Sequence, residues 1–329
     1  MAVMVTGGAG YIGSHAVLAL LDAGYEVVVV DNLVTGFSWA VDGRATLVQC
    51  DVADEGRVRA AIRGHHVDAV MHFAGSVVVP ESVSDPLKYY RNNTAASRSL
   101  IESAVTEGVP HFIFSSTAAT YGTPERVPVA EGDPTVPINP YGMSKLMTEA
   151  MLRDVAAAHA MNYACLRYFN VAGADPEGRS GQSTAGATHL IKVGVEAACG
   201  KRDGVSVFGT DFPTEDGTGV RDYIHVSDLA AAHVAALDLL RAEPTRSHTL
   251  NCGYGRGFSV NQVLDAVDRV TNVAIERRLE GRRAGDPAEL IADNRAILAT
   301  LDWRPQRDDL DGIVRDALAW ERRLEERGR

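Results

Sequence analysis

A glycine-rich turn between an apolar run and a helical stretch constrains the fold of this chain more than any other feature. Residues 6–13 read Thr-Gly-Gly-Ala-Gly-Tyr-Ile-Gly, so Gly7, Gly10 and Gly13 form a GxxGxxG pattern. Glycine lets the backbone turn tightly and lets a pyrophosphate approach the start of the next helix, where free N–H groups and the helix dipole favour anions. A glycine turn can also be nothing more than a turn, so its surroundings have to decide.

Apolar runs and helical stretches alternate through the first half of the chain. The runs are almost wholly apolar, which is typical of a parallel sheet with helices on both faces. The pattern therefore predicts an α/β fold with a Rossmann-type, doubly wound parallel sheet. The expected strands are 2–6, 26–31, 46–50, 69–73, 111–115 and 162–169, and the expected helices are 11–23, 92–107 and 141–160.

The pattern loosens after Asn170, because residues 171–187 are rich in Gly, Ala, Ser and Asp and are expected to form a loop. We expect two domains: residues 1–170 as a dinucleotide-binding domain and residues 171–329 as a smaller α/β substrate-binding lobe, partly interleaved with the first. The second half mixes expected helices at 188–200, 226–240, 260–270 and 310–326 with short expected strands at 205–208 and 248–251.

The strand ends that follow the glycine turn specify the dinucleotide. Asp31 ends the second expected strand, where a carboxylate can accept hydrogen bonds from the adenine ribose hydroxyls and would repel a 2′-phosphate, so NAD is favoured over NADP. The alternative is that Asp31 only caps the turn that follows. Asp51 and Val52 follow the third strand, and residues 73–75 follow the fourth; both lie where ligands of such sheets bind, although either could be a plain strand-end turn.

Tyr141 and Lys145 open a long expected helix and form the strongest chemical signal in the sequence. Residues four apart share a helix face. The phenol of a tyrosine in water has a pKa of about 10, and lowering it by about three units takes roughly 4 kcal/mol, which a neighbouring ammonium and a nicotinamide cation can supply. The hydroxyl of Thr117, just beyond the preceding strand, is the candidate to bind the substrate oxygen that loses its proton, although polar strand ends are common.

Composition excludes several other classes of protein. The net charge of −11 argues against a nucleic-acid surface, and the ten histidines show no metal-ligand spacing. No apolar run reaches membrane-spanning length, and the apolar start lacks a basic flank, so we expect a strand there and no signal peptide. Four scattered cysteines without a CxxC pair favour reduced thiols in the cytoplasm.

These motifs together resemble the extended short-chain dehydrogenase/reductase family, and within it the nucleotide-sugar 4-epimerases. The resemblance runs from Met1 to about Trp320, and its most specific stretch is PTEDGTGVRDYIHVSDLA at residues 213–230. It implies interconversion of UDP-glucose and UDP-galactose through a transient 4-keto sugar with tightly bound NAD, carried out by a homodimer. The other stretches are TGGAGYIGSH (6–15), DN (31–32), HFAG (72–75), YYRNN (89–93), YGMSKLMTE (141–149) and LRYFNVAGA (166–174).

The resemblance also implies roles by position. Tyr141 is the implied base and acid, with Lys145 and Thr117 beside it. Arg221 and Arg283 suit a pyrophosphate, because guanidinium forks match phosphate oxygens. The implied NAD-binding residues are Gly7, Gly10, Tyr11, Ile12, Gly13, Asp31, Asn32, Asp51, Val52, Phe73, Ala74, Gly75, Asn92, Tyr141, Lys145 and Phe169. The implied UDP-sugar residues are Thr117, Asn170, His189, Leu190, Phe208, Arg221, Arg283, Asp286 and Leu290.

The chain departs from the common family pattern at four of the matched positions. Thr117 replaces a serine and keeps the hydroxyl, whereas Val77 replaces a lysine that reaches the cofactor. His189 replaces an asparagine near the nucleotide. Leu290 replaces a tyrosine at the sugar end, which could leave room for an N-acetyl group, so UDP-N-acetylhexosamines are a second substrate hypothesis.

Three alternative functions remain at this point. A 4,6-dehydratase usually carries Asp-Glu after the matched Thr, but Ala118 and Ala119 stand there and cannot transfer protons. A UDP-glucuronate epimerase or decarboxylase needs a cation for the carboxylate, which the sequence does not exclude. A non-catalytic NAD-binding sensor tends to lose the Tyr/Lys pair, and this chain keeps both residues. Fold alone does not decide among them.

Overall fold

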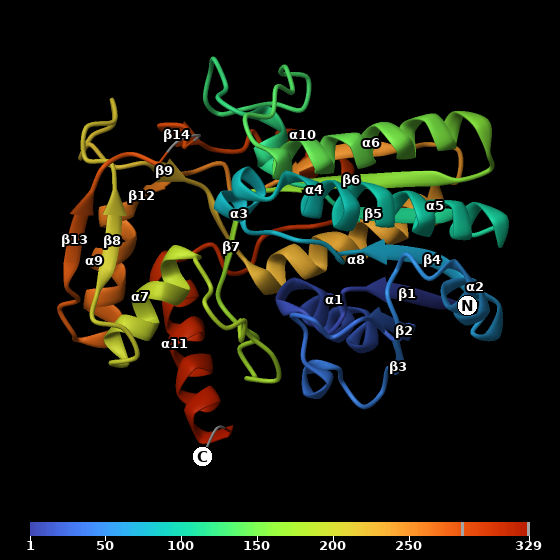
Figure 1. Cartoon of the computed structure of the whole chain (residues 1–329), viewed down its shortest axis with the longest axis horizontal. Helices are drawn as coiled ribbons and strands as arrows, with labels where there is room; N and C mark the ends of the chain where they lie inside the picture. The colour runs from blue at the N-terminus through green and yellow to red at the C-terminus, as the bar shows by residue number, and fades with distance from the viewer. Residues whose placement is uncertain (284–285, 328–329) are drawn as a thin grey trace.

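The computed structural model, which describes residues 1–283 and 286–327, is built on a seven-stranded sheet (Figure 1). Every neighbouring pair of strands is parallel, and the order is β11-β6-β5-β4-β1-β2-β3. The strands are β1 (Ala2–Thr6), β2 (Glu26–Asp31), β3 (Thr46–Gln49), β4 (Val67–His72), β5 (His111–Ser115), β6 (Asn162–Tyr168) and β11 (His248–Cys252).

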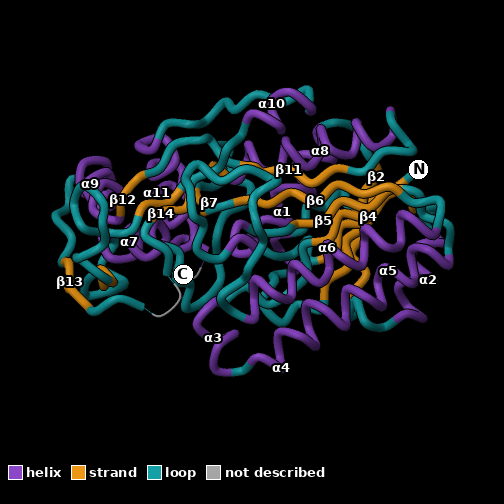
Figure 2. Tube along the Cα trace, turned by 90° about the horizontal axis from the view of Figure 1, so that it is seen from above, coloured by secondary structure: helices purple, strands orange, loops and turns teal. Residues whose placement is uncertain are grey.

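Helices cover both faces of this sheet, as Figure 2 shows from a second direction. Successive side chains of a strand point to opposite faces. In β1, Val3 and Val5 join the core beneath α1 (Tyr11–Asp22) and α8 (Val226–Ala242). Ala2 and Met4 join the core beneath α2 (Glu55–Gly64), α5 (Ala96–Thr106) and α6 (Pro140–Ala158). The Rossmann-type sheet predicted from the continuous apolar runs is confirmed.

A smaller α/β lobe adjoins the large sheet. Its separate core packs α7 (Leu190–Ala198), α9 (Val260–Thr271) and α11 (Leu310–Arg327) against short strands. Ser259 and Gln262 form a capping box that begins α9. The short strands pair as β7 (Asn170–Ala172) with β10 (Tyr223–His225), β8 (Val205–Phe208) with β13 (Arg277–Glu280), and β12 (Phe258–Ser259) and β14 (Glu289–Leu290) with β9 (Val220–Arg221); a short α10 (Arg295–Thr300) follows β14.

The second half of the chain also returns to the large sheet. β11 lies beside β6 with Leu250 opposite Leu166, and α8 packs against α1 and β6. Two elements from beyond residue 170 therefore complete the sheet that the first half begins.

The helix predicted over residues 92–107 is interrupted. Two short helices, α3 (Val79–Ser84) and α4 (Pro86–Tyr89), lead into a π-helical turn at Tyr90–Ala95, and α5 begins only at Ala96. Such π-turns frequently occur at functional sites. Periodicity alone does not reveal a single widened turn. In the described residues, no helix is both long and apolar enough to cross a membrane.

Candidate active site

The glycine turn forms a close backbone approach at the carboxyl end of β1. Gly7 has a φ of 70°, and a Cβ there would lie 2.6 Å from the backbone N of Ala74. A Cβ on Gly13 would lie 2.1 Å from the Gly7 carbonyl oxygen. Gly10 is the N-cap of α1 and brings no side chain to the first-turn N–H groups, which suits a bound pyrophosphate.

Asp31 connects this turn to the neighbouring strand. Its Oδ2 accepts a hydrogen bond from Ala9 N (3.0 Å), and its Oδ1 accepts one from Leu33 N (2.8 Å). The capping contact considered from sequence is therefore formed, together with a contact to the glycine turn. Asn32 Nδ2 donates to Asp51 Oδ2 (3.0 Å), so the polar ends of β2 and β3 meet. These groups suit the ribose and adenine of a dinucleotide.

The segment after β4 is joined to α6 by Asn93, a residue that sequence reasoning missed. Asn93 is 2% exposed; its Oδ1 accepts from Ser76 N (2.7 Å) and its Nδ2 donates to Ser144 Oγ (3.0 Å). Its neighbour Asn92 donates to Ser76 Oγ (3.1 Å). The YYRNN stretch could have drawn attention to Asn93, but only the π-helical turn turns it toward α6.

The start of α6 fixes the Tyr/Lys pair. Asn139 caps the helix by accepting a hydrogen bond from Gly142 N (2.9 Å), and Pro140 occupies the first turn. Tyr141 and Lys145 are 6% and 3% exposed. Lys145 Nζ donates to the Ser115 carbonyl oxygen (2.9 Å) and lies 4.8 Å from the centre of the Phe114 ring. Lys145 is thus held against the end of β5.

Burial acts on both ionisable groups. It raises the pKa of Tyr141, and the nearby Thr117 side chain opposes that rise. Burial lowers the pKa of Lys145 to about 8, while the Glu149 carboxylate opposes this shift. Lys145 therefore remains largely an ammonium at pH 7, one helical turn from a phenol that burial keeps neutral until a further cation is bound. Sequence reasoning predicted the ammonium but not its desolvation.

A second cluster of implied site residues lies in the smaller lobe. The Arg283 guanidinium lies 4.4 Å from the centre of the Phe208 ring, and its Nε donates to Asp286 Oδ2 (3.1 Å). Arg221 Nη2 lies 3.8 Å from Asp286 Oδ1. Leu290 is opposite Arg221 where β14 pairs with β9. Burial lowers the pKa of Arg221, as expected for a cation kept away from water. The two guanidinium groups therefore meet at the Asp286 carboxylate, and the Phe208 ring packs against one of them.

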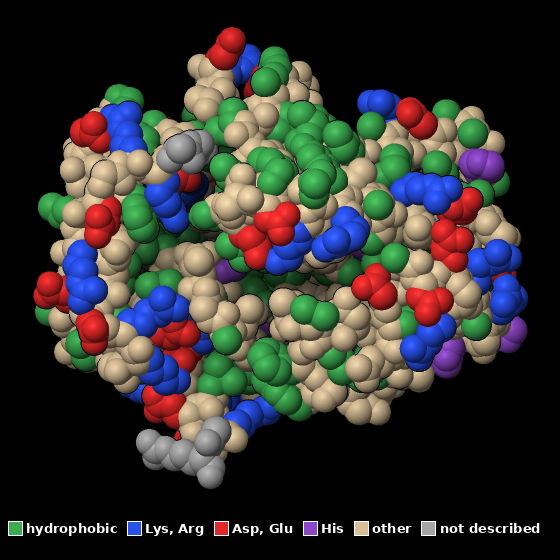
Figure 3. All heavy atoms as spheres, viewed as in Figure 1, with side chains coloured by type: hydrophobic (Ala, Val, Ile, Leu, Met, Phe, Trp, Pro, Cys, Tyr) green, Lys and Arg blue, Asp and Glu red, His purple; other side chains and the backbone are tan. Residues whose placement is uncertain are grey.

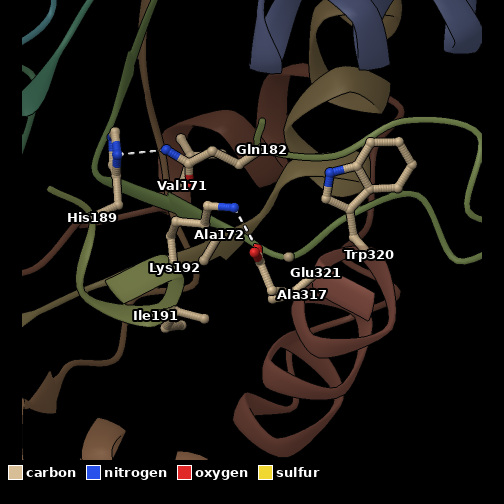
Figure 4. A pocket seen from close by; sticks show the side chains of 10 residues that line it. Val171, Ala172, Gln182, His189, Ile191, Lys192, Ala317, Trp320 and Glu321 are labelled. Carbon is tan, nitrogen blue, oxygen red and sulfur yellow. Dashed lines mark hydrogen bonds and ion pairs between the residues drawn. The ribbon is translucent and has the colours of Figure 1, made fainter. Parts of the chain in front are cut away.

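His189 and Leu190 begin α7, and His189 lines a pocket between α7 and α11 (Figure 4). Gln182 Nε2 lies 2.7 Å from His189 Nδ1, and both residues line the pocket with Trp320 and Lys192. Gly173, also in its wall, accepts a hydrogen bond from the Tyr11 hydroxyl (2.7 Å). His189 is thus connected through this wall to the glycine turn.

The remaining implied residues lie at the carboxyl edge of the large sheet or in the core beneath it. Phe73 follows β4, Phe169 is largely buried after β6, and Asn170 begins β7 with its N–H donated to Asp222 O (2.9 Å). Val52 is buried in the core under α2, and Ile12 packs on the core under α1. Figure 3 shows the surface hollowed between the part that carries α3 and the part that carries α1. The described residues contain no cluster that could hold a metal ion.

Comparison with known proteins decides the family. Residues 3–253 match the NAD dependent epimerase/dehydratase family. The chain belongs to this family.

Relatives within the NAD dependent epimerase/dehydratase family are similar over nearly the whole chain. A UDP-glucose 4-epimerase of Azospirillum brasilense is 55% identical over 324 residues, which cover 98% of this chain and 93% of that protein. A crystal structure of a UDP-glucose 4-epimerase from Stenotrophomonas maltophila with bound NAD and formylated UDP-arabinopyranose has a TM-score of 0.96 and 41% identity, covering 99% of both chains. A UDP-Glc/GlcNAc 4-epimerase from Campylobacter jejuni has a TM-score of 0.85 and 46% identity, covering 98% of this chain and 99% of that one.

Membership of the NAD dependent epimerase/dehydratase family confirms the resemblance inferred from the motifs. It also confirms NAD as the cofactor, and the open glycine turn beside Asp31 fits that cofactor. The roles of the individual residues remain predictions from sequence that the geometry supports.

Proposed function

We propose that this protein interconverts UDP-glucose and UDP-galactose by 4-epimerisation, using NAD that it retains. The observation that carries the proposal is the buried Tyr141–Lys145 pair with the Thr117 hydroxyl beside it, at the sheet edge that begins with the glycine turn. The 55% identity to a UDP-glucose 4-epimerase supports the choice of substrate.

The chain's own residues account for the proton transfers. Tyr141, ionised by the combined charges of the Lys145 ammonium and the nicotinamide cation of bound NAD, would take the proton of the sugar 4-hydroxyl while Thr117 orients that oxygen. Bound NAD supplies the hydride acceptor at C4 and the source from which hydride returns to the opposite face of the sugar. Arg221 and Arg283 hold the pyrophosphate while the 4-keto sugar turns, and Tyr141 then gives the proton back.

We assign NAD to residues 1–170 and the UDP-sugar to residues 171–329 within this mechanism. The glycine turn, Asp31 and Asp51 support the first assignment, because they gather at the carboxyl ends of β1 to β3. The cluster of Arg221, Arg283 and Asp286 supports the second, since it lies outside the large sheet.

One assay tests the proposed reaction. Purified protein incubated with UDP-galactose and no added NAD should form UDP-glucose, measured by chromatography of the sugar nucleotides. Retained NAD without turnover of any nucleotide sugar would instead support a non-catalytic NAD-binding sensor. A 4,6-dehydratase is disfavoured because Ala118 and Ala119, which follow Thr117, have no group that transfers a proton.

Leu290 is expected to admit N-acetylated substrates. It lies on β14 opposite Arg221, and its side chain is shorter than the tyrosine of the common family pattern. UDP-N-acetylglucosamine should therefore be turned over at a rate comparable to that of UDP-glucose. The Leu290→Tyr variant should lose about 10-fold or more of kcat/KM for the N-acetylated sugar, since a clash in a pocket is worth about 1–3 kcal/mol. Its activity on UDP-glucose is the internal control, and inertness of the wild-type protein toward UDP-N-acetylglucosamine would contradict the hypothesis.

We further propose that the protein is a cytoplasmic homodimer formed through the exposed side of α5 and α6. Hydrophobic side chains lie exposed on adjacent α3, α4 and α6, and Figure 3 shows such side chains gathered over this part of the molecule. They are Val83, Leu87 and Met147. All four cysteines are free, which supports a reducing compartment.

The Met147→Asp variant is expected to shift the protein from dimer to monomer. Met147 is 40% exposed, so the change leaves the core intact but places a charge in the proposed contact. Light scattering during size-exclusion chromatography measures the mass. The Val273→Asp variant, whose side chain is similarly exposed at the far end of the smaller lobe, should remain dimeric.

A further inference from the structure

Helix α6 carries a third buried polar residue in line with the catalytic pair. Tyr141, Lys145 and Glu149 follow one another at intervals of four residues and so share one face of the helix. Glu149 accepts two hydrogen bonds from Arg167 of β6, from Nε (2.9 Å) and from Nη2 (2.6 Å). The two side chains are 8% and 7% exposed. A buried carboxylate needs such pairing, because an isolated charge away from water is costly.

Hydrogen bonds connect this ion pair to the segment that carries Thr117. Glu149 Oε1 accepts a hydrogen bond from Ser116 Oγ (2.5 Å), and Lys145 donates to the carbonyl oxygen of the residue before it (2.9 Å). Two successive residues at the end of β5 are therefore fixed to α6, and the next residue is Thr117. The segment that follows β5 is therefore attached by hydrogen bonds to α6, the helix that also carries Tyr141.

The other end of the same segment is held by Arg167. Its Nη1 donates to the Tyr121 hydroxyl (2.9 Å), which in turn donates to Asn251 Oδ1 on β11 (2.7 Å). Thr117 caps the single 3₁₀ turn between these attachment points, accepting a hydrogen bond from Ala119 N (3.1 Å). The position of its hydroxyl relative to Tyr141 consequently depends on both members of the ion pair.

We propose that the buried Glu149–Arg167 pair positions Thr117 and Lys145 against Tyr141 for the proton transfer at the sugar 4-hydroxyl. This role rests on the proposed epimerase function. A misplacement of about 1 Å at reacting groups can cost about 10²-fold in rate, so such a pair can control turnover without touching the substrate.

The Glu149–Arg167 pair is also expected to affect the pKa of Lys145, through the charges that surround its ammonium group. The ionisable groups that face it are Tyr141 and Glu149 on α6 and His72 on β4. Burial, and after it the Lys145 charge, lower the pKa of His72 to about 3, so His72 is neutral and Glu149 is the anion near the ammonium. Removing that anion while leaving Arg167 in place would lower the pKa of Lys145.

The Glu149→Gln variant tests both consequences. It keeps the size of the side chain and an acceptor oxygen but removes the charge. We expect kcat to fall by about 10²-fold with KM changed less than about twofold, since the sugar nucleotide is held elsewhere. The alkaline limb of the kcat–pH profile should move to lower pH, which a purely structural defect would not cause. An unchanged kcat with an unchanged profile would overturn the proposal.

A double variant separates positioning from folding. Replacing both charges, Glu149→Met with Arg167→Met, leaves no unpaired buried charge and should preserve the melting temperature and the retained NAD. We expect kcat to stay low, whereas recovery of wild-type kcat would show that the pair serves only stability and would overturn the proposal. If this variant does not fold, Ser116→Ala decides, because it deletes one small hydroxyl contact; it should lower kcat several-fold at constant KM, and a normal kcat would overturn the proposal.

The chain offers a matched control. Arg241 Nη2 donates to both oxygens of Asp68 (2.9 and 2.8 Å), and this pair lies at the amino end of β4, away from the site. The Asp68→Asn variant should change stability but not kcat or its pH profile. If the wild-type protein turns over UDP-galactose and the Glu149 and Ser116 variants have the same kcat, only the positioning role is refuted. Absence of wild-type turnover would refute the epimerase function and the role that rests on it.

Discussion

The Tyr141→Phe variant is expected to lose nearly all turnover of UDP-galactose and to keep its NAD. The change removes one hydroxyl from a side chain that is buried on all sides, so the ring still fills its place beside Tyr89, whose ring centre is 6.4 Å away. The other ionisable groups on this face of α6 cannot replace it as base, because Lys145 is itself an ammonium at pH 7 and the Glu149 carboxylate is paired with Arg167. General acid–base catalysis is worth about 10²–10⁴-fold, and we expect a loss near the upper end.

Two measurements are needed to interpret that result. Turnover is measured by sugar-nucleotide chromatography, and NAD content is measured enzymatically after the protein is denatured. The matched control is Tyr90→Phe, which removes a hydroxyl from the neighbouring π-helical turn outside the Tyr/Lys pair and should retain activity. Near-normal activity of Tyr141→Phe would refute the mechanism, and loss of NAD would mean that the hydroxyl mainly holds the cofactor.

The Gly13→Ala variant is expected to purify without NAD. The added Cβ would lie 2.1 Å from the Gly7 carbonyl oxygen, a distance that a side chain cannot occupy, and the atom it meets is backbone. The turn must therefore open, and the first-turn N–H groups of α1 lose their alignment for a pyrophosphate. We expect at least about 100-fold weaker NAD binding, a loss of about 2.7 kcal/mol. Turnover without added NAD should disappear accordingly.

The control for this substitution is Gly64→Ala at the end of α2, where an added Cβ meets nothing within 4 Å. It should keep its NAD and its activity. NAD content by absorbance after extraction, together with far-ultraviolet circular dichroism, distinguishes loss of cofactor from loss of fold. If Gly13→Ala retains a full complement of NAD, the dinucleotide does not lie against this turn.

The sequence allowed six strands of the large sheet to be predicted, because each is a mainly apolar run beside a clear turn. The seventh strand, β11, was expected as a strand but its place was open, since pairing with β6 joins residues far apart in the chain. Helix α2 was missed, because its first residues are charged and only a narrow face is buried. Local composition carries no information about long-range pairings such as that of β11 with β6.

The candidate site was predictable to a similar degree. Tyr141, Lys145 and Thr117 could be selected as candidates because helical spacing and strand ends are expected to place them together. The network behind them was not, although Glu149 and Arg167 lie inside stretches that define the resemblance. A Glu in a helix and an Arg in a strand are usually exposed, and only the packing of α6 on β6 encloses them.

The return of the chain to the large sheet has a consequence for how the protein is made. The edge of β6 stays unpaired until β11 has left the ribosome, some 80 residues later. Helix α1 likewise lacks its packing partner until α8 has been synthesised. An open edge of a parallel sheet invites wrong association. A fragment that stops at residue 170 should therefore aggregate instead of forming an independent nucleotide-binding unit, and the two halves of the molecule acquire their native form as one cooperative event.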